Sequence, residues 1–276
     1  MIESRNLFKL QSRIAIDNKT IPVKTLEKNY ILAWILTGIS KAAFADKLTF
    51  KGGTALKKIY FQDYRFSEDL DFTLTEELSG EEIEKYLYEI FEIVRELANI
   101  PLSIKNRETH ISGYTFYINF SGPLGADIKR GEIKTDFTHT EKIIHKPVRK
   151  NLIDYHEYDD IPKDTILPVY PLEEIFIEKY LSILDKRRNE PRDLYDLWYL
   201  CKHRCLEYDF LSSGIKEKGG FKGITDFNML NALNEKEGRY TATWEKRLSY
   251  HMLELPEVNS VLREIRKHIK KLNDAF

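Results

Sequence analysis

The stretch from residue 48 to residue 72 constrains the fold of this chain more than any other. It runs through four elements in a fixed order: a short apolar strand, a turn with two glycines, a short helical segment and a second strand. The first strand is Leu48 to Phe50, and the helical segment is Ala55 to Phe61. The second strand contains Asp69 and Asp71, and both carboxylates point the same way because residues two apart in a strand share a face. The apolar residues that alternate with them then point into a core.

These paired carboxylates predict a metal site. Two carboxylates held side by side on a strand repel each other unless a cation lies between them. Oxygen ligands of this kind suit Mg²⁺ or Mn²⁺, which bind a few carboxylates together with substrate phosphates. Upstream, Gly52, Gly53 and Thr54 lie at the start of the helical segment, where glycine lets the backbone approach a ligand and free N–H groups bind phosphate. We therefore expect a phosphate-binding turn and a metal-binding pair within one stretch.

The order of these elements resembles the nucleotidyltransferase superfamily, in which a Gly-Gly or Gly-Ser turn, a helix and an Asp-x-Asp strand follow one another. The longer string Lys-Gly-Gly-Thr-Ala-Leu, continued by Arg-Phe-Ser-Glu-Asp-Leu-Asp-Phe, is similar to the AbiEii/AbiGii toxin family. These proteins are the toxins of type IV toxin–antitoxin and abortive-infection systems. The resemblance implies a nucleotidyltransferase in which Asp69 and Asp71 are catalytic metal ligands and the Gly-Gly-Thr turn, Lys57 and Ser67 bind the nucleotide.

A later strand offers the third carboxylate that the superfamily uses. In the segment from Glu132 to Thr138 the apolar residues share one face, while Lys134 and Asp136 share the other. The position of this strand after the Asp-x-Asp strand favours Asp136 as a catalytic metal ligand and Lys134 as a nucleotide contact. The alternative is an edge strand with a cross-strand ion pair. Asp127 is a second candidate carboxylate, but the glycines and proline just before it are typical of a turn.

Two helical segments in the second half of the chain match the same family. Lys179 lies in the first, from Leu172 to Asp185, and the second begins at Pro191. A lysine and an arginine beside a triphosphate offset its charge and hold the leaving pyrophosphate. The resemblance implies catalytic roles for Lys179 and Asp196 and nucleotide contacts for Arg188, Arg192 and Asp193. Without the resemblance, the same charges are interpreted as an ion network on a helix surface.

The whole pattern predicts an α+β (α/β) protein, with a nucleotidyltransferase core on a small mixed sheet flanked by helices, followed by a helical C-terminal domain. Ser79 and Glu82 form a capping box that starts a helix before three strand-like segments. Residues 139–169 are polar and contain prolines, so we expect irregular structure there. We expect residues 1–160 to form the catalytic domain and residues 161–276 a helical domain that completes the nucleotide site. Further helices are expected over 228–237, 244–253 and 257–272.

Composition narrows the class of protein further. The chain has 276 residues, 42% apolar and 32% charged, enough for one large domain or two small ones. Its two cysteines predict no disulfide framework and fit a reducing cytosol. No apolar run reaches the length of a membrane span, and the start lacks the apolar core of a signal peptide, so we expect no membrane and a cytoplasmic location. Because the formal net charge is −1, any nucleic-acid binding must use local basic patches.

Together these features predict an enzyme that depends on Mg²⁺ or Mn²⁺, transfers a nucleotidyl group from a nucleoside triphosphate and releases pyrophosphate. By resemblance, the acceptor is RNA, with a tRNA 3′ end expected, and the effect is growth arrest. A cognate antitoxin then acts without a tight complex. Two alternatives stay open: a nucleotidyltransferase that modifies a small molecule, and a catalytically weak binding protein that acts through a partner. A basic groove at the carboxylates favours RNA, whereas a closed acidic pocket favours a cationic small molecule.

Overall fold

A computed structural model describes residues 1–125, 131–153, 157–203 and 208–273 of the chain. The chain forms two compact units, each assembled from three segments. Unit 1 comprises Met1–Glu141, Pro147–Val169 and His251–Leu253, and unit 2 comprises Lys142–Lys146, Tyr170–Tyr250 and Glu254–Phe276. We expected a domain boundary after residue 160. That residues 1–160 and 161–276 form two separate domains stays a prediction.

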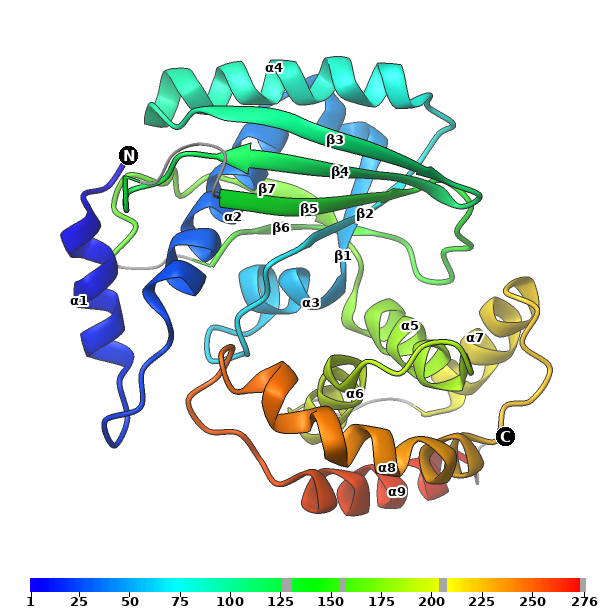
Figure 1. Cartoon of the computed structure of the whole chain (residues 1–276). Helices are drawn as coiled ribbons and strands as arrows, with labels where there is room; N and C mark the ends of the chain where they lie inside the picture. The colour runs from blue at the N-terminus through cyan, green and yellow to red at the C-terminus, as the bar shows by residue number, and fades with distance from the viewer. Residues whose placement is uncertain (126–130, 154–156, 204–207, 274–276) are drawn as a thin grey trace. The chain divides into compact units, whose positions relative to one another are not determined.

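Within the described residues, unit 1 is built on a seven-stranded mixed sheet with the order β3-β4-β5-β2-β1-β7-β6 (Figure 1). Its strands are β1 Leu48–Lys51, β2 Leu70–Leu74, β3 Leu102–His110, β4 Gly113–Phe120, β5 Gly131–Thr138, β6 Val148–Asn151 and β7 Ile166–Val169. Strand β2 pairs antiparallel with β1 and parallel with β5, so the sheet is mixed as expected. The two strands that carry the candidate carboxylates are therefore direct neighbours.

Strands β6 and β7 correct our expectation that residues 139–169 are irregular. Each has only four residues, and β6 is exposed along its whole length at the edge of the sheet. Proline at position 168 argues against a strand in the sequence, because it cannot donate a hydrogen bond to a neighbouring strand. In the structure it lies opposite Arg149 in the pairing of β6 with β7. The sequences of β6 and β7 are too short and too polar to predict strands. In the structure, β7 nevertheless pairs with β1 and buries Leu167 and Val169 in the core.

Helices cover the sheet of unit 1. They are α1 Ser4–Ile14, α2 Val23–Lys41, α3 Gly52–Ala55 and α4 Gly80–Ala98, with a 3₁₀ turn Ala43–Lys47 and a π-helical turn Leu56–Tyr60 that continues α3. Figure 1 shows α4 lying along the sheet. The predicted capping box is present, because Ser79 and Glu82 exchange side-chain and backbone hydrogen bonds at the start of α4. Helices α2 and α4 approach closely at Gly38, where a Cβ atom would lie 2.8 Å from Val94 Cγ2.

Unit 2 is helical in its described residues. Its helices are α5 Leu172–Leu184, α6 Pro191–His203, α7 Tyr208–Phe221, α8 Met229–Leu248 and α9 Val258–Asn273. Helix α7 was not expected, and the segments expected over 228–237 and 244–253 are joined in the single helix α8, which ends at Leu248 instead of continuing to residue 253. The helix continues because Leu233, Tyr240, Trp244 and Leu248 are buried at helical spacing across the exposed Gly238. None of the helices in the described part of the chain is long and apolar enough to cross a bilayer.

Buried polar contacts explain why short segments join a unit far from them in sequence. In unit 2, the Glu174 carboxylate accepts hydrogen bonds from the backbone N–H groups of Ile144 and His145, at 3.1 and 2.8 Å. It also lies 2.6 Å from the Lys218 ammonium, and both side chains are fully buried. In unit 1, the backbone N–H of Phe66 donates to the carbonyl of His251 at 2.7 Å. These contacts fix residues 142–146 to unit 2 and residues 251–253 to unit 1.

Candidate active site

The carboxylates predicted to bind metal lie on adjacent strands of unit 1. Asp71 in β2 lies directly opposite Asp136 in β5, and Asp69 immediately precedes β2. The side chains that alternate with them, Leu70 and Phe72, are fully buried, whereas the aspartates are half-buried. The alternation expected from the sequence is therefore present, and it leaves the carboxylates on the face away from the core.

Lys134 links the three carboxylates electrostatically. Its Nζ lies 2.6 Å from Asp136 Oδ2, and Thr115 donates a hydrogen bond to the other oxygen of the same carboxylate. Partial burial lowers the pKa of Lys134, but the hydrogen bond with Asp136 and the negative charges of Asp136, Asp71 and Asp69 raise it above its ordinary value overall. The ammonium therefore lies within the field of all three aspartates, as a bound cation would.

The chemistry of the three carboxylates suits a divalent cation, but their arrangement in this structure does not form a metal site. Three carboxylates on or beside neighbouring strands are hard oxygen ligands of the kind that Mg²⁺ and Mn²⁺ bind. The ion pair between Lys134 and Asp136 already places one positive charge beside these groups. Among the described residues, no group of three or more His, Cys, Asp or Glu side chains is arranged to hold a metal ion. The alternative carboxylate, Asp127, lies outside the described residues.

The glycine turn lies directly against charged side chains. Gly52 has a φ of +81°, and a Cβ atom at this position would collide with the carboxylate of Asp71. At Gly53 a Cβ atom would lie 2.6 Å from a guanidinium nitrogen of Arg65. The hydroxyl of Thr54 donates to the backbone carbonyl of Asp69, which ties the turn to the start of β2. Both glycines are required because a side chain would displace the charged groups of the candidate site.

Two cations in this region were not assigned from the sequence. Arg65 is 3% exposed and lies over Gly53, where Ser67 Oγ is also 3.5 Å from the position of a Cβ atom. Lys51 lies opposite Asp71 in the pairing of β1 with β2, and its Nζ is 3.6 Å from Glu141. Both residues belong to the strings that carry the family resemblance. Only their place in the sheet and turn shows that they lie beside the candidate site.

Lys57 is turned into the loop that precedes β2. Its ammonium donates to the carbonyl of Gln62 at 2.5 Å and lies 4.3 Å from the centre of the Phe66 ring. Burial lowers the pKa of Lys57 to about 8, which the nearby negative charge of Asp63 offsets only in part. A contact between Lys57 and the nucleotide stays a prediction.

The pKa of Lys57 predicts how stability changes with pH. In the unfolded chain a lysine keeps its proton up to about pH 10.4. Between about pH 8 and that value the unfolded state binds more protons than the folded state, so the free energy of unfolding should rise with pH, by roughly 3 kcal/mol from this group. Urea unfolding of Lys57→Met across this range should show a rise smaller by about that amount, because the lowered pKa values of Lys58 and Lys236 still contribute, whereas Lys246→Met, which alters an exposed lysine, should keep the full rise. Parallel curves for Lys57→Met and the wild type would contradict the assignment.

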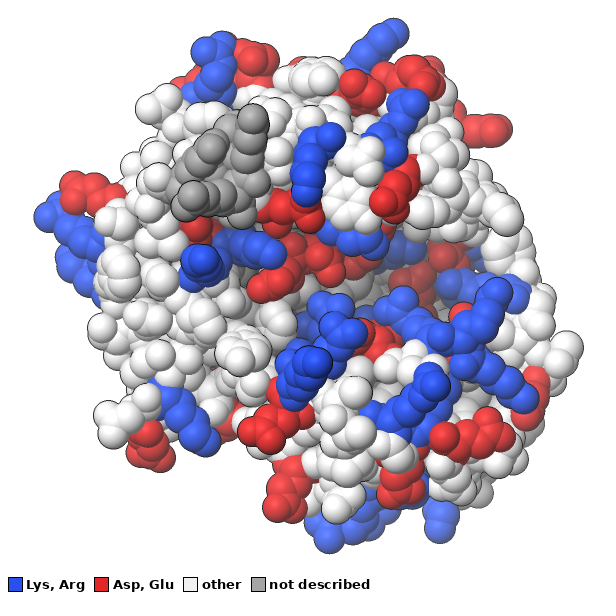
Figure 2. All heavy atoms as spheres, viewed as in Figure 1, with Lys and Arg blue, Asp and Glu red and all other residues white. Residues whose placement is uncertain are grey.

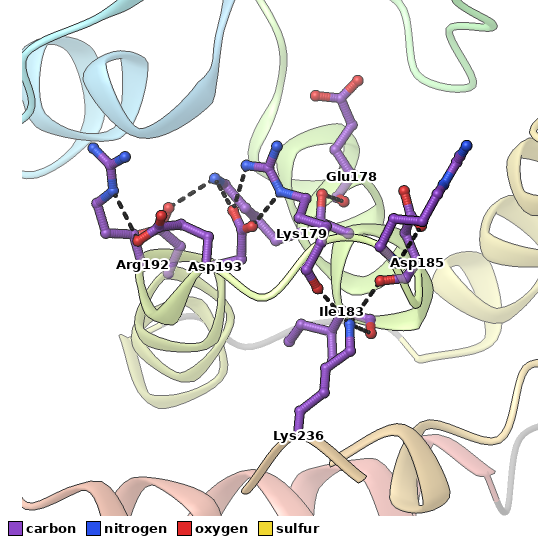
Figure 3. A network of polar contacts seen from close by, with 12 residues as sticks. Glu178, Lys179, Ile183, Asp185, Arg192, Asp193 and Lys236 are labelled. Atoms are coloured by element: carbon purple, nitrogen blue, oxygen red, sulfur yellow. Dashed lines mark hydrogen bonds and ion pairs between the residues drawn. The ribbon is translucent and has the colours of Figure 1, made fainter. Parts of the chain in front are cut away.

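In unit 2, the charges predicted on two helices form a buried cluster (Figure 3). Lys179 Nζ lies 2.8 Å from both Asp193 and Asp196, whose side chains are 3% and 0% exposed. Arg188 also pairs with Asp193. Burial raises the pKa of Asp193, but the charges of Lys179 and Arg188 lower it below its ordinary value overall. The cluster is therefore an interior ion network rather than a solvated helix surface.

Arg192, the other predicted cation of unit 2, and the basic loop before α6 are more exposed than Lys179. Arg192 pairs with Glu190 at 3.3 Å, while Lys186, Arg187 and Arg188 are exposed on the loop between α5 and α6. Figure 2 shows basic side chains gathered on the face of unit 2 that is in view. The structure thus brings together Lys179, Arg188, Asp193 and Asp196. Their roles toward a nucleotide stay predictions.

Comparisons with known proteins show the family of this chain and a fold that it shares with solved structures. Residues 34–269 match the family described as nucleotidyl transferase AbiEii toxin, type IV toxin–antitoxin system. The fold is similar to that of MenT4, a nucleotidyltransferase toxin from Mycobacterium tuberculosis, with a TM-score of 0.63, 16% identity and 97% of each chain covered. It is also similar to JHP933 from Helicobacter pylori, with a TM-score of 0.57, 15% identity, and 92% of this chain and 93% of that chain covered. No curated protein matches the chain.

Proposed function

The chain belongs to the AbiEii family of nucleotidyltransferase toxins of type IV toxin–antitoxin systems, and from this premise we propose that it transfers a nucleotidyl group from a nucleoside triphosphate to RNA. The observation that carries the proposal is the register of β2 and β5, which sets Asp71 opposite Asp136 beside the Gly52 turn. A tRNA 3′ end is the proposed acceptor. The reaction belongs in the cytoplasm, where both substrates are found.

We assign Asp69, Asp71 and Asp136 as the residues that would hold Mg²⁺ or Mn²⁺. A bound metal would lower the pKa of the acceptor hydroxyl and neutralise charge on the phosphates. The backbone of Gly52 and Gly53 has no side chain that blocks a triphosphate, so its N–H groups can bind phosphate oxygens. The remaining charge on the triphosphate is offset by cationic side chains of the protein.

Cationic side chains offset the charge that the aspartates and the triphosphate bring together. In unit 1 this role falls to Lys134, which already lies in the field of the three carboxylates. In unit 2 we assign Lys179, Arg188 and Arg192 to the triphosphate, with Asp193 and Asp196 orienting Lys179 through their ion pairs. Each cation favours the pyrophosphate leaving group, because negative charge grows on it during transfer.

Labelled triphosphates test the reaction directly. With Mg²⁺, the protein should move label to RNA from an α-labelled triphosphate and not from a γ-labelled one, because nucleotidyl transfer releases the β- and γ-phosphates as pyrophosphate. A tRNA preparation whose 3′-terminal ribose has been oxidised by periodate is the matched control and should accept no label. Transfer of the γ label would identify a kinase. Label that appears only in a small-molecule extract would replace RNA by a small-molecule acceptor.

A further inference from the structure

The loop between α5 and α6 is held from beneath by one lysine of α8 (Figure 3). Lys236 is 5% exposed, and its ammonium donates to the backbone carbonyls of Ile183, Asp185 and Arg188 at 2.6, 2.7 and 2.7 Å. The first two carbonyls lie at the end of α5, where the last turn of a helix leaves its acceptors without partners in the helix. The third belongs to the residue assigned to the triphosphate.

The hydrogen bonds of Lys236 match its chemistry in number. An ammonium has three N–H donors and no acceptor, so three carbonyls use its full capacity. No donor is left for a ligand, and the side chain is buried under the loop, so Lys236 acts on a ligand only through other residues. Lys236 belongs to no motif in the sequence, because its partners are backbone carbonyls, which any residue provides.

Contacts fix both the backbone and the side chain of Arg188. Its carbonyl accepts from Lys236, and its backbone N–H donates to the carbonyl of Asp185 at 3.1 Å. Its guanidinium pairs with Asp193, which also pairs with Lys179. Two other exposed cations, Lys186 and Arg187, precede it in the loop. Arg187 pairs with Asp185 at 3.3 Å, and the repulsion that remains among the three cations opposes a single loop conformation.

We propose that Lys236 is a positioning residue for nucleotide binding, which holds the α5–α6 loop so that Arg188 presents its guanidinium to the triphosphate. The role of Arg188 rests on the proposed function, whereas the anchoring of the loop rests on the three hydrogen bonds alone. Lys236 therefore controls how tightly the triphosphate binds without touching it.

Limited trypsin digestion of the native protein tests the anchor without an activity assay. Trypsin cleaves after Lys186, Arg187 and Arg188, so Lys236→Met should make the loop cleave at least about tenfold faster, with the sites identified by mass spectrometry. Leu248→Ala is the matched control, because it removes a buried side chain from the same helix about 18 Å away along the axis. It should lower the melting temperature and leave cleavage of the loop unchanged.

Kinetics test whether the anchor acts through Arg188. Lys236→Met should raise the KM for the triphosphate about 10-fold, which is the lower end of the effect of removing a partner that orients a ligand-binding side chain, and change kcat much less. In an Arg188→Ala background the same substitution should have no further effect on KM, because the side chain that it positions is gone. A general loss of structure would not produce this lack of additivity.

Each outcome decides a different point. Unchanged cleavage of the loop in Lys236→Met, or an equal rise in KM with and without Arg188, overturns the inference. If Lys236→Met does not fold, Lys236→Arg takes its place, because its planar fork of donors cannot meet three converging carbonyls, and the same increase in cleavage is expected. If the wild-type protein transfers no nucleotide, the proposed function fails, while the digestion still decides whether Lys236 anchors the loop.

Discussion

Asp69→Asn and Asp71→Asn should each lower nucleotidyl transfer by about 10³-fold or more, close to complete loss. Asparagine keeps the volume of the side chain but removes the negative charge that would hold a divalent cation. Without that cation the acceptor hydroxyl keeps its proton, and charge on the leaving pyrophosphate is not neutralised, which are separate contributions to the barrier. The measurement is the initial rate of transfer from an α-labelled triphosphate at saturating Mg²⁺.

Stability separates a functional carboxylate pair from a structural one. Asp69 and Asp71 are half-buried in a group of like charges, so neither substitution should lower the free energy of unfolding without metal by more than about 1 kcal/mol. Asp46→Asn is the matched control: its side chain is 82% exposed on the same unit, and transfer should be unchanged. A clear fall in the metal-free melting temperature of both variants would mean that the pair supports the fold instead.

Growth gives the cellular counterpart of this result. Expression of the wild-type protein should slow bacterial growth, and Asp69→Asn expressed to the same soluble level should not, because the proposed toxicity is the transfer reaction itself. A cognate antitoxin should restore growth without co-purifying with the toxin, as expected for one that acts without a tight complex. Growth arrest by Asp69→Asn would instead favour a binding protein that acts through a partner.

Local sequence patterns were enough to predict the elements that carry the candidate site. The alternation of Leu70 and Phe72 with the aspartates follows from the period of a strand, and the capping box at Ser79 follows from the chemistry of a helix start. The family resemblance added what local patterns lack, namely the prediction that segments more than 100 residues apart serve one activity. Elements without a strong period, such as β6, β7 and α7, escaped prediction.

Contacts that depend on tertiary structure could not be predicted from the sequence, for a different reason. Lys236 and Arg188 are 48 residues apart, and their contact joins a side chain to a backbone carbonyl that any residue could provide. Glu174 likewise binds two backbone N–H groups. The sequence marks these side chains only as charges on helices, where exposure is the usual outcome. Their burial becomes visible only when the helices are packed.

Lys179→Met should destabilise the protein as well as inactivate it, because its ammonium lies between two buried carboxylates. Removal of one partner of a buried ion pair leaves an uncompensated charge and costs about 3–5 kcal/mol. The sequence-based interpretation gave Lys179 a catalytic role, with an ion network on a helix surface as the alternative, and the buried pairs with Asp193 and Asp196 add a structural role. The free energy of unfolding by urea at pH 7 measures this effect, with Lys246→Met as the control at an exposed lysine.

The stability lost in Lys179→Met should depend on pH in a direction that the pKa of Asp193 predicts. In the wild type the pKa of Asp193 is lowered overall, so its contribution to stability is complete above the unfolded pKa and is lost as the pH falls through the folded pKa. In Lys179→Met burial acts with less compensation and raises the carboxylate pKa values, so the variant should lose least relative to the wild type near pH 4 and most at pH 7. The double variant Lys179→Met/Asp196→Asn should recover much of the loss at pH 7, because it also removes a buried charge. Equal losses at both pH values, or an additive double variant, would show that the ion network does not set the stability of unit 2.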